Sequence, residues 1–182
     1  SISCNCFEHN PEWKSNLVDM YRVTKKGAHL IIQIASRGFD EHGTTRTDPD
    51  LSVASQEKGW NYYRNVNVRE FLAESSKLDF EFHFITYNPF SRDLYFFGKK
   101  GLKISDKKNK QINKEFKKLL KPIFVKYEDE NFRYFRLGWR ILFSFPLFIA
   151  MYLFSDPIYQ DIHFNYHQNK KRFKRFLRSL VK

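Results

Sequence analysis

The feature that most limits the possible folds is an apolar run, Leu-Ile-Ile-Gln-Ile-Ala, over residues 30–35. Its polar and apolar side chains do not alternate, and it directly follows a segment with helical periodicity. Such a run predicts a strand that is buried on both faces of a parallel sheet. We therefore expect an α/β protein in which residues 30–35 form a buried strand.

The residues ahead of this run predict a strand and a helix. Residues 2–7 have the composition of a strand, and Asn10, Pro11 and Glu12 resemble a helix start with a capping amide, an early proline and an acid. Apolar residues then recur at helical spacing up to position 21, and Gly27 ends the helix because glycine tolerates a positive φ. Residues 2–35 are therefore predicted to form a strand–helix–strand unit.

A polar stretch without clear periodicity, residues 36–67, follows this unit. Loops of this length inside a compact domain usually carry function, as lids or binding loops. Asn67 and Glu70 have the spacing of a capping box, which predicts a short helix after the loop. Residues 80–85 and 94–97 predict two strands around a turn at Asn88-Pro89, which should pair as an antiparallel hairpin at an edge of the sheet.

The front part contains Phe7-Glu8-His9 ahead of the predicted helix, and Lys25-Lys26-Gly27 ahead of the buried strand. These two motifs resemble class I S-adenosylmethionine-dependent methyltransferases of the type 11-like group. The segment after the fourth strand of that family often contains Phe-Glu-His, as Phe7-Glu8-His9 does here, and is followed by a helix. An Arg-Val-Leu-Lys-Pro-Gly-Gly turn then enters the fifth strand, and residues 22–28 match it with Lys26 in place of proline and Ala28 in place of the second glycine. The hairpin resembles strands six and seven, which end the family's seven-stranded sheet. The resemblance covers about residues 1–100 and rests on the order and spacing of these motifs.

The resemblance implies a partial Rossmann-like sheet, equivalent to strands four to seven, and methyl transfer from S-adenosylmethionine to oxygen or nitrogen. The acceptor class is a small molecule, a glycan precursor or a lipid. The family's glycine-rich turn and acidic cofactor ligand would lie upstream of Ser1, and no two of the chain's glycines have the Gly-x-Gly spacing of such a turn. We therefore expect an N-terminally truncated fragment that is inactive alone, with cofactor contacts limited to Ser3, Cys4 and Asn5. Hydride transfer on a similar sheet is a weaker rival, which would need its own upstream glycine motif.

Candidate residues for the acceptor side come from the resemblance and from the long loop. Glu8 and His9 occupy positions that face cofactor or substrate in the family, although a histidine there also suits a hydrogen bond at a helix entry. His42 is the candidate general base for an acceptor hydroxyl or amine, and the competing interpretation is a histidine that only caps a turn. The candidate acceptor-recognition residues, which would otherwise form a tyrosine-rich flap on the sheet, are Arg46, Tyr62, Tyr63 and Arg64.

Cys4, Cys6 and His9 have a spacing that metal sites sometimes use, but a structural zinc site needs a fourth ligand. Alternate positions on a strand share one face, so we expect the two cysteines to be small buried side chains and no metal to be bound. Two cysteines so close in sequence cannot form a disulfide framework, which favours a reducing, intracellular compartment.

The charge of the chain divides it into two parts. Residues 1–104 hold 14 Lys and Arg against 13 Asp and Glu, whereas residues 105–182 hold 18 against 7. We therefore expect a methyltransferase half-domain over residues 1–104 and a basic, aromatic-rich helical extension over residues 105–182. Two amphipathic helices are predicted in the extension, one near residues 110–123 and one near residues 170–180, around an uncharged segment at residues 141–155.

Three interpretations of the extension remain open. The uncharged segment is shorter than the roughly twenty residues that span a membrane, and Pro146 interrupts it. Together with the basic helices it favours peripheral binding to an anionic membrane surface over binding to nucleic acid, for which no long apolar block is needed. Equally, the segment could pack against the domain or a second subunit, with the charged residues in solvent.

Overall fold

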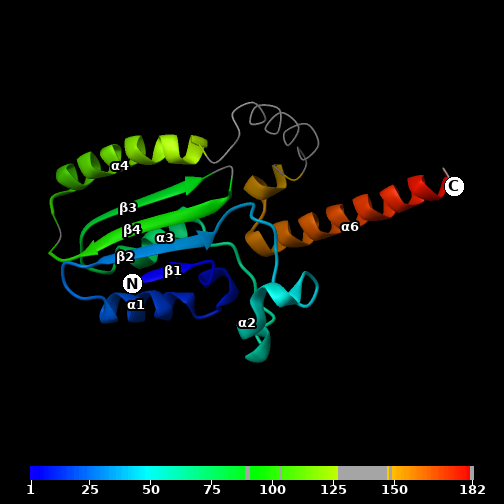
Figure 1. Ribbon diagram of the computed structural model, residues 1–182, viewed down its shortest axis with the longest axis horizontal. Coiled ribbons are helices and arrows are strands. Elements are labelled where there is room, and N and C mark those ends of the chain that lie inside the picture. The colour runs from blue at the N-terminus through cyan, green and yellow to red at the C-terminus, as the bar shows by residue number, and fades with distance from the viewer. Residues whose placement is uncertain (89–90, 103, 127–146, 148, 181–182) are drawn as a thin grey trace.

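A four-stranded mixed sheet forms the centre of the protein (Figure 1). The computed structural model describes residues 1–88, 91–102, 104–126, 147 and 149–180. The strands are β1 (Ile2–Cys4), β2 (His29–Ala35), β3 (Phe80–Asn88) and β4 (Asp93–Lys100), in the order β1-β2-β4-β3. β1 and β2 are parallel, and the other two pairings are antiparallel. The predicted mixed α/β class is therefore confirmed.

The strand–helix–strand unit is present, with a first strand and a helix that are shorter than predicted and a second strand that begins one residue earlier. β1 ends at Cys4, a 3-10 turn η1 (Phe7–His9) follows, and helix α1 (Trp13–Val23) leads to β2. Asn10 does not cap the helix: its side-chain oxygen accepts a hydrogen bond from the Glu12 amide (2.8 Å) and holds the turn ahead of α1. Gly27, at φ +79°, reverses the chain into β2 as expected, and its amide donates to the Lys100 carbonyl (2.7 Å).

The prediction that residues 30–35 are buried on both faces is wrong. Leu30, Ile32 and Ile34 are fully buried, whereas Ile31 is 39% exposed and Gln33 is half-buried. One face of the sheet is covered by α1 and by α3 (Val68–Ser75), which contribute Trp13 and Phe71 to the core. The other face is covered by α4 (Asp106–Lys126), which contacts β3 and leaves this side of β2 partly open (Figure 1).

The predicted hairpin is confirmed, and its second strand lies inside the sheet, between β2 and β3. Neighbouring residues of β4 face opposite sides: the Phe96 ring contacts Phe71 and Phe80, whereas the Phe97 ring contacts Phe82 and Phe116. Residues 89 and 90 of the predicted turn lie outside the described part of the chain.

The long loop has some helical structure that its sequence did not indicate. It contains η2 (Pro49–Ser52) and α2 (Val53–Glu57). The capping prediction at its end is correct, because the Asn67 side chain accepts a hydrogen bond from the Glu70 amide (2.9 Å) at the start of α3.

Helix α4 and the last helix of the extension pack against the front part, and residues 149–153 between them are also helical. Phe116 of α4 lies on the sheet, with its ring 5.4 Å from that of Phe84, but Leu119, predicted on the same apolar face, is 67% exposed. The last helix, α6 (Asp156–Leu180), begins earlier than predicted and buries Tyr159 and Gln160 at the long loop. Its remaining turns extend away from the sheet (Figure 1). The apolar predictions at Ile123, at residues 141–146 and 148, and for side chains at 173–180 lie outside the described parts.

Candidate functional site

Four side chains meet beside the carboxyl ends of β1 and β2, the edge where open α/β sheets bind ligands. Glu8 and His9 come from η1, directly after β1, and His42 and Tyr63 come from the long loop after β2. All four side chains were candidates from the sequence, and the structure brings them together. The loop reaches this position because the Arg64 amide donates to the Glu8 carbonyl (2.9 Å) and the Val66 amide donates to the Ala35 carbonyl (3.1 Å).

The two histidines are in direct contact. Their Nε2 atoms lie 3.2 Å apart, and His42 Nδ1 lies 3.0 Å from the Asp40 carbonyl oxygen. A carbonyl oxygen only accepts, so neutral His42 carries its proton on Nδ1 and leaves a lone pair on Nε2. His9 then donates from its own Nε2, which leaves the buried Nδ1 of His9 as an acceptor, and no described group hydrogen-bonds to it.

Burial and the neighbouring His42 lower the pKa of His9 to about 4, so His9 is neutral at physiological pH. The Tyr63 ring packs against both imidazoles, with centroid distances of 5.4 Å to His9 and 4.9 Å to His42. Burial raises the pKa of Tyr63 well above its usual range, and its hydroxyl donates to the Asn65 side chain (3.0 Å). Tyr63 is therefore a neutral wall of the site and not an acid.

Glu8 is a fully buried carboxyl group that has no well-formed hydrogen bond among the described residues, although the backbone amides of Glu8 and Ala35 lie close enough to influence it. Its exposed fraction is 0%, and neither carboxylate oxygen has a partner among the described residues. Burial raises the pKa of Glu8 to about 7, despite the opposing influence of the backbone amides of Glu8 and Ala35. A buried carboxyl group without a partner carries a desolvation cost that an added proton or cation would remove.

Arg46 lies apart from this cluster, at the contact between the loop and α6. Its guanidinium donates to both carboxylate oxygens of Glu41 and to Asp161 of α6 (2.5 Å). The hydrogen bonds and charges of Glu41 and Asp161 outweigh burial, which alone would lower the pKa of Arg46, and raise this pKa above its already high value. Arg46 therefore joins the loop to α6 through two carboxylates, an arrangement in which its charge is neutralised.

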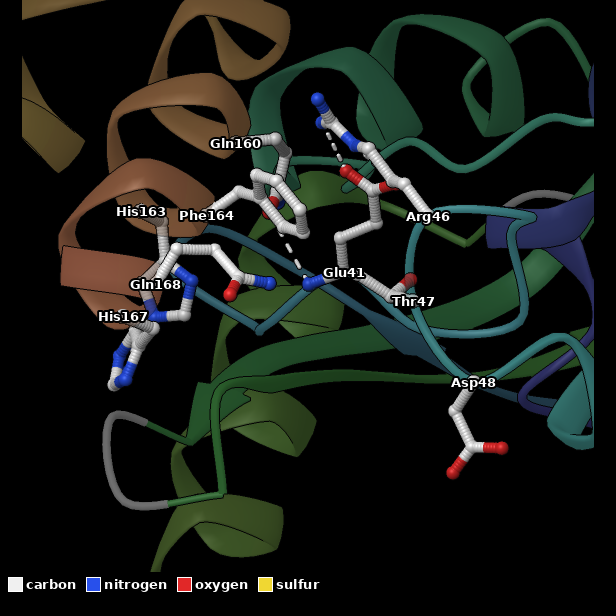
Figure 2. Close-up of a pocket in the computed structure, with 9 residues that line it drawn as sticks. All are labelled: Glu41, Arg46, Thr47, Asp48, Gln160, His163, Phe164, His167 and Gln168. Atoms are coloured by element: carbon white, nitrogen blue, oxygen red, sulfur yellow. Dashed lines mark hydrogen bonds and ion pairs between the residues drawn. The ribbon is translucent and has the colours of Figure 1, made fainter. Parts of the chain in front are cut away.

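Beside this ion pair the loop and α6 enclose a cavity of about 320 Å³ (Figure 2). Gln160 accepts a hydrogen bond from the Glu41 amide (3.1 Å), and His163 lies 3.0 Å from the Asp40 carboxylate. These α6 residues were not among the candidates from the sequence, because the terminal helix was expected only near residues 170–180. The four-residue spacing of His163 and His167 was the signal that would have extended the helix towards the loop.

The remaining candidates do not join the cluster. Arg64 forms an ion pair with Glu70 (2.9 Å) and a side-chain hydrogen bond with Tyr62. Tyr62 is half-buried, and this burial raises its pKa. At the end of β1, Cys4 and Asn5 are exposed and Ser3 is half-buried. Asn5 adopts a left-handed backbone conformation, at φ 51°, where asparagine is tolerated.

The two cysteines are exposed, so the prediction that they are buried is wrong. β1 ends at Cys4, so Cys6 is not on the strand, and its Sγ donates to the Cys4 carbonyl (3.2 Å). In the described part of the chain, His9 lies with Glu8 and His42 as potential ligands and with neither cysteine.

No described helix is long and apolar enough to span a membrane. Comparison of the chain with protein-family models, with curated proteins and with solved structures finds no match.

Proposed function

We propose that the chain forms the second half of an S-adenosylmethionine-dependent methyltransferase domain that acts on an oxygen or nitrogen acceptor. The observation that carries the proposal is the meeting of Glu8, His9 and His42 at the carboxyl edge of the parallel strands β1 and β2. The order of a parallel pair followed by an antiparallel hairpin supports it, because the resemblance expects strands four to seven in this sequence.

The residues at the end of β1 fit the rim of a cofactor site. Cys4 and Asn5 present exposed side chains beside the carboxyl edge, and Ser3 is accessible next to them. β1 is also the outer strand of the sheet and pairs with β2 alone among the described strands. When bound there, S-adenosylmethionine would supply an electrophilic methyl carbon. The greater part of its pocket would come from residues ahead of Ser1.

The chain's own residues would hold and deprotonate the acceptor. In the absence of a methyl acceptor, the lone pair on His42 Nε2 accepts a hydrogen bond from His9. An acceptor hydroxyl that displaces this contact would donate to His42 Nε2, and its oxygen would become the nucleophile as the proton leaves. Tyr63 and Phe39 pack on His42 and fix the plane of the imidazole. Arg46 would hold the loop in place through Glu41 and Asp161 and would not touch the acceptor.

The proposal is tested on the protein together with whatever residues its gene encodes ahead of Ser1. We expect calorimetry to show that this longer protein binds S-adenosylmethionine in the micromolar range, and that residues 1–182 alone do not. A longer protein that does not bind the cofactor would overturn the proposal. Micromolar binding by residues 1–182 would show that the cofactor site lies elsewhere.

The role of His42 is tested by His42→Ala in the same protein. Loss of a general base lowers turnover by about 10²–10⁴-fold, whereas the Kd for S-adenosylmethionine stays within about twofold, because His42 acts on the acceptor. His29→Ala is the matched control, since His29 is exposed at the opposite end of β2. Unchanged turnover in His42→Ala would assign His42 a structural role.

A further inference from the structure

The three residues at the carboxyl edge carry a ligand set for a metal ion. Glu8 offers a carboxylate oxygen, and His9 and His42 each offer an imidazole nitrogen, with all three ligand atoms within 4.8 Å of one another. In a tetrahedral site, ligand atoms 2.0–2.2 Å from the ion lie about 3.3–3.6 Å from one another. The widest separation therefore has to close by up to about 1.5 Å, through rotation of the ligand side chains.

The distance between the two histidines matches the spacing of metal ligands. Their Nε2 atoms are 3.2 Å apart. Two nitrogens held 2.0–2.1 Å from a tetrahedral zinc ion are separated by about 3.3 Å. The rings also meet edge to face, with an interplanar angle of 81°, so the two nitrogens approach from different directions. An ion would therefore replace the hydrogen bond between the rings without a rearrangement of the loop.

An independent observation is the state of Glu8. Its side chain is completely buried, and both carboxylate oxygens lack hydrogen bonds among the described residues. Buried polar groups in proteins are almost always paired, and the rare exceptions call for an explanation such as an ion or water. A cation held by the two histidines would compensate this carboxylate, since its oxygens lie beside their nitrogens.

His42 is already oriented as metal-binding histidines are. Its Nδ1 lies 3.0 Å from the Asp40 carbonyl, so the ring donates on that side and directs the Nε2 lone pair towards His9. In metal sites the second ring nitrogen usually donates to a carbonyl or carboxylate in this way, which fixes the tautomer of the ligand. Tyr63 and Phe39 pack on the same imidazole, with ring centroids 4.9 Å and 5.4 Å away, and restrict its rotation.

We propose that Glu8, His9 and His42 bind a divalent transition-metal ion, with Zn²⁺ as the reference case. Two imidazoles and one carboxylate suit zinc and other first-row transition metals, whereas Mg²⁺ and Ca²⁺ prefer sites made of oxygen ligands. Three protein ligands leave at least one coordination position for water or another oxygen ligand. This proposal departs from the expectation from sequence that no metal is bound.

The metal site does not depend on the proposed methyl transfer, because all three ligands lie within residues 1–182. If both hold, His42 would be a ligand and not a base, and the ion would polarise the acceptor oxygen at its open position. If residues 1–182 bind Zn²⁺ but the longer protein does not bind S-adenosylmethionine, the metal site stands and the methyltransferase proposal is rejected. If the longer protein binds S-adenosylmethionine but residues 1–182 do not bind Zn²⁺, the metal site is rejected and the methyltransferase proposal stands.

The test is Zn²⁺ binding by residues 1–182, measured by calorimetry, with Co²⁺ spectroscopy to identify the ligands. We expect one high-affinity Zn²⁺ per chain, and Co²⁺ bands of nitrogen and oxygen ligands without a thiolate charge-transfer band. Glu8→Gln and His42→Ala should each raise the Kd for Zn²⁺ at least about 100-fold, because loss of even an outer-shell partner costs 10–100-fold. Circular dichroism checks that each variant folds. If Glu8→Gln does not fold, the result for His42→Ala, which lies on the loop, decides the test.

Two matched controls remove the competing zinc ligands of the chain. Cys4→Ser with Cys6→Ser removes the exposed thiols, and His163→Ala with His167→Ala removes the histidine pair of α6. Both doubly substituted chains should bind Zn²⁺ with the affinity of the unaltered chain. Binding that survives Glu8→Gln and His42→Ala, or that disappears in either control, would overturn the proposal. Equal affinity for Mg²⁺ would also overturn it, because nitrogen ligands could not then be the basis of binding.

Discussion

Gly43, next to His42, is the residue that lets the loop approach His9. Its φ is +69°, and a Cβ at this position would lie 2.6 Å from Ser52 Cβ and 2.8 Å from His9 Cε1. Both the backbone conformation and the lack of space therefore require glycine here. The position of His42 in the site depends on this close approach, since His42 directly precedes Gly43 in the loop.

Gly43→Ala should accordingly destabilise the protein more than an alanine at an uncrowded glycine. Gly59 is the matched control, because its φ is +71° and no atom lies within 4 Å of a Cβ built there. We expect Gly59→Ala to lower the free energy of unfolding by about 1–2 kcal/mol through backbone strain. Gly43→Ala should cost a further 1–3 kcal/mol or so for the steric conflict, measured by urea unfolding. Equal losses at the two positions would mean that the loop does not pack tightly on His9.

At the scale of elements, α6 holds the long loop through charged side chains. Glu41 is nearly buried and accepts hydrogen bonds from Arg46 and from the Thr44 hydroxyl (2.6 Å). Burial alone raises the pKa of Glu41, but these hydrogen bonds outweigh it, and the pKa lies below its ordinary value of 4.5. A carboxyl group with a lowered pKa stabilises the fold above its ordinary pKa, and this stabilisation is lost as the pH falls through the lowered value.

Arg46→Met should remove this pH-dependent stabilisation. We expect the variant to be less stable than the unaltered protein at neutral pH by about 1 kcal/mol, at the low end for a hydrogen-bonded charge because Arg46 is 38% exposed. The two stabilities should converge as the pH falls below the ordinary pKa of Glu41, in urea unfolding at several pH values. Arg22→Met is the control, because the Arg22–Asp19 pair is exposed and should contribute little at any pH. If the difference in the free energy of unfolding stayed constant across the pH range, the contribution of Arg46 would not depend on the charge of Glu41.

At the scale of the whole molecule, the extension presents a basic surface although its helices α4 and α6 pack on the front part. Phe116 lies on the side of α4 that faces the sheet. Six lysines of α4 are exposed: Lys107, Lys108, Lys110, Lys114, Lys117 and Lys118. From the uncharged segment, Leu147 and Ala150 are buried, whereas Tyr152, Leu153 and Phe154 are largely exposed. The packing interpretation therefore holds for part of this segment, and an apolar patch remains exposed beside α6.

We predict that this surface binds anionic membranes. Co-sedimentation with vesicles that contain phosphatidylserine should fall at high salt, because exposed lysines act through screened charge. A fraction should remain bound, because apolar burial of residues 152–154 is not screened. Leu153→Asp with Phe154→Asp should abolish this salt-resistant fraction, and neutral vesicles are the control. A protein that stays in the supernatant at low salt would contradict the prediction.

The sequence by itself determined the elements whose signals are local. The apolar run at residues 30–35, the glycine at position 27 and the capping pair Asn67 and Glu70 depend on neighbours within a few residues, and each specifies its element. The same holds for the Phe-rich hairpin, whose strands are separated by only four residues in the sequence. Local patterns also placed Glu8, His9, His42 and Tyr63 among the candidates for the site.

Only the tertiary structure decided which of these residues meet. His9 and His42 are 33 positions apart and touch because the loop folds back onto η1, and Arg46 pairs with Asp161 across 115 positions. The exposed side of Ile31 was equally unpredictable, since it depends on how far α4 covers the sheet. Contacts of this kind are set by packing between distant segments, and no periodicity within one segment records them. The unpaired burial of Glu8, on which the metal proposal rests, has the same origin.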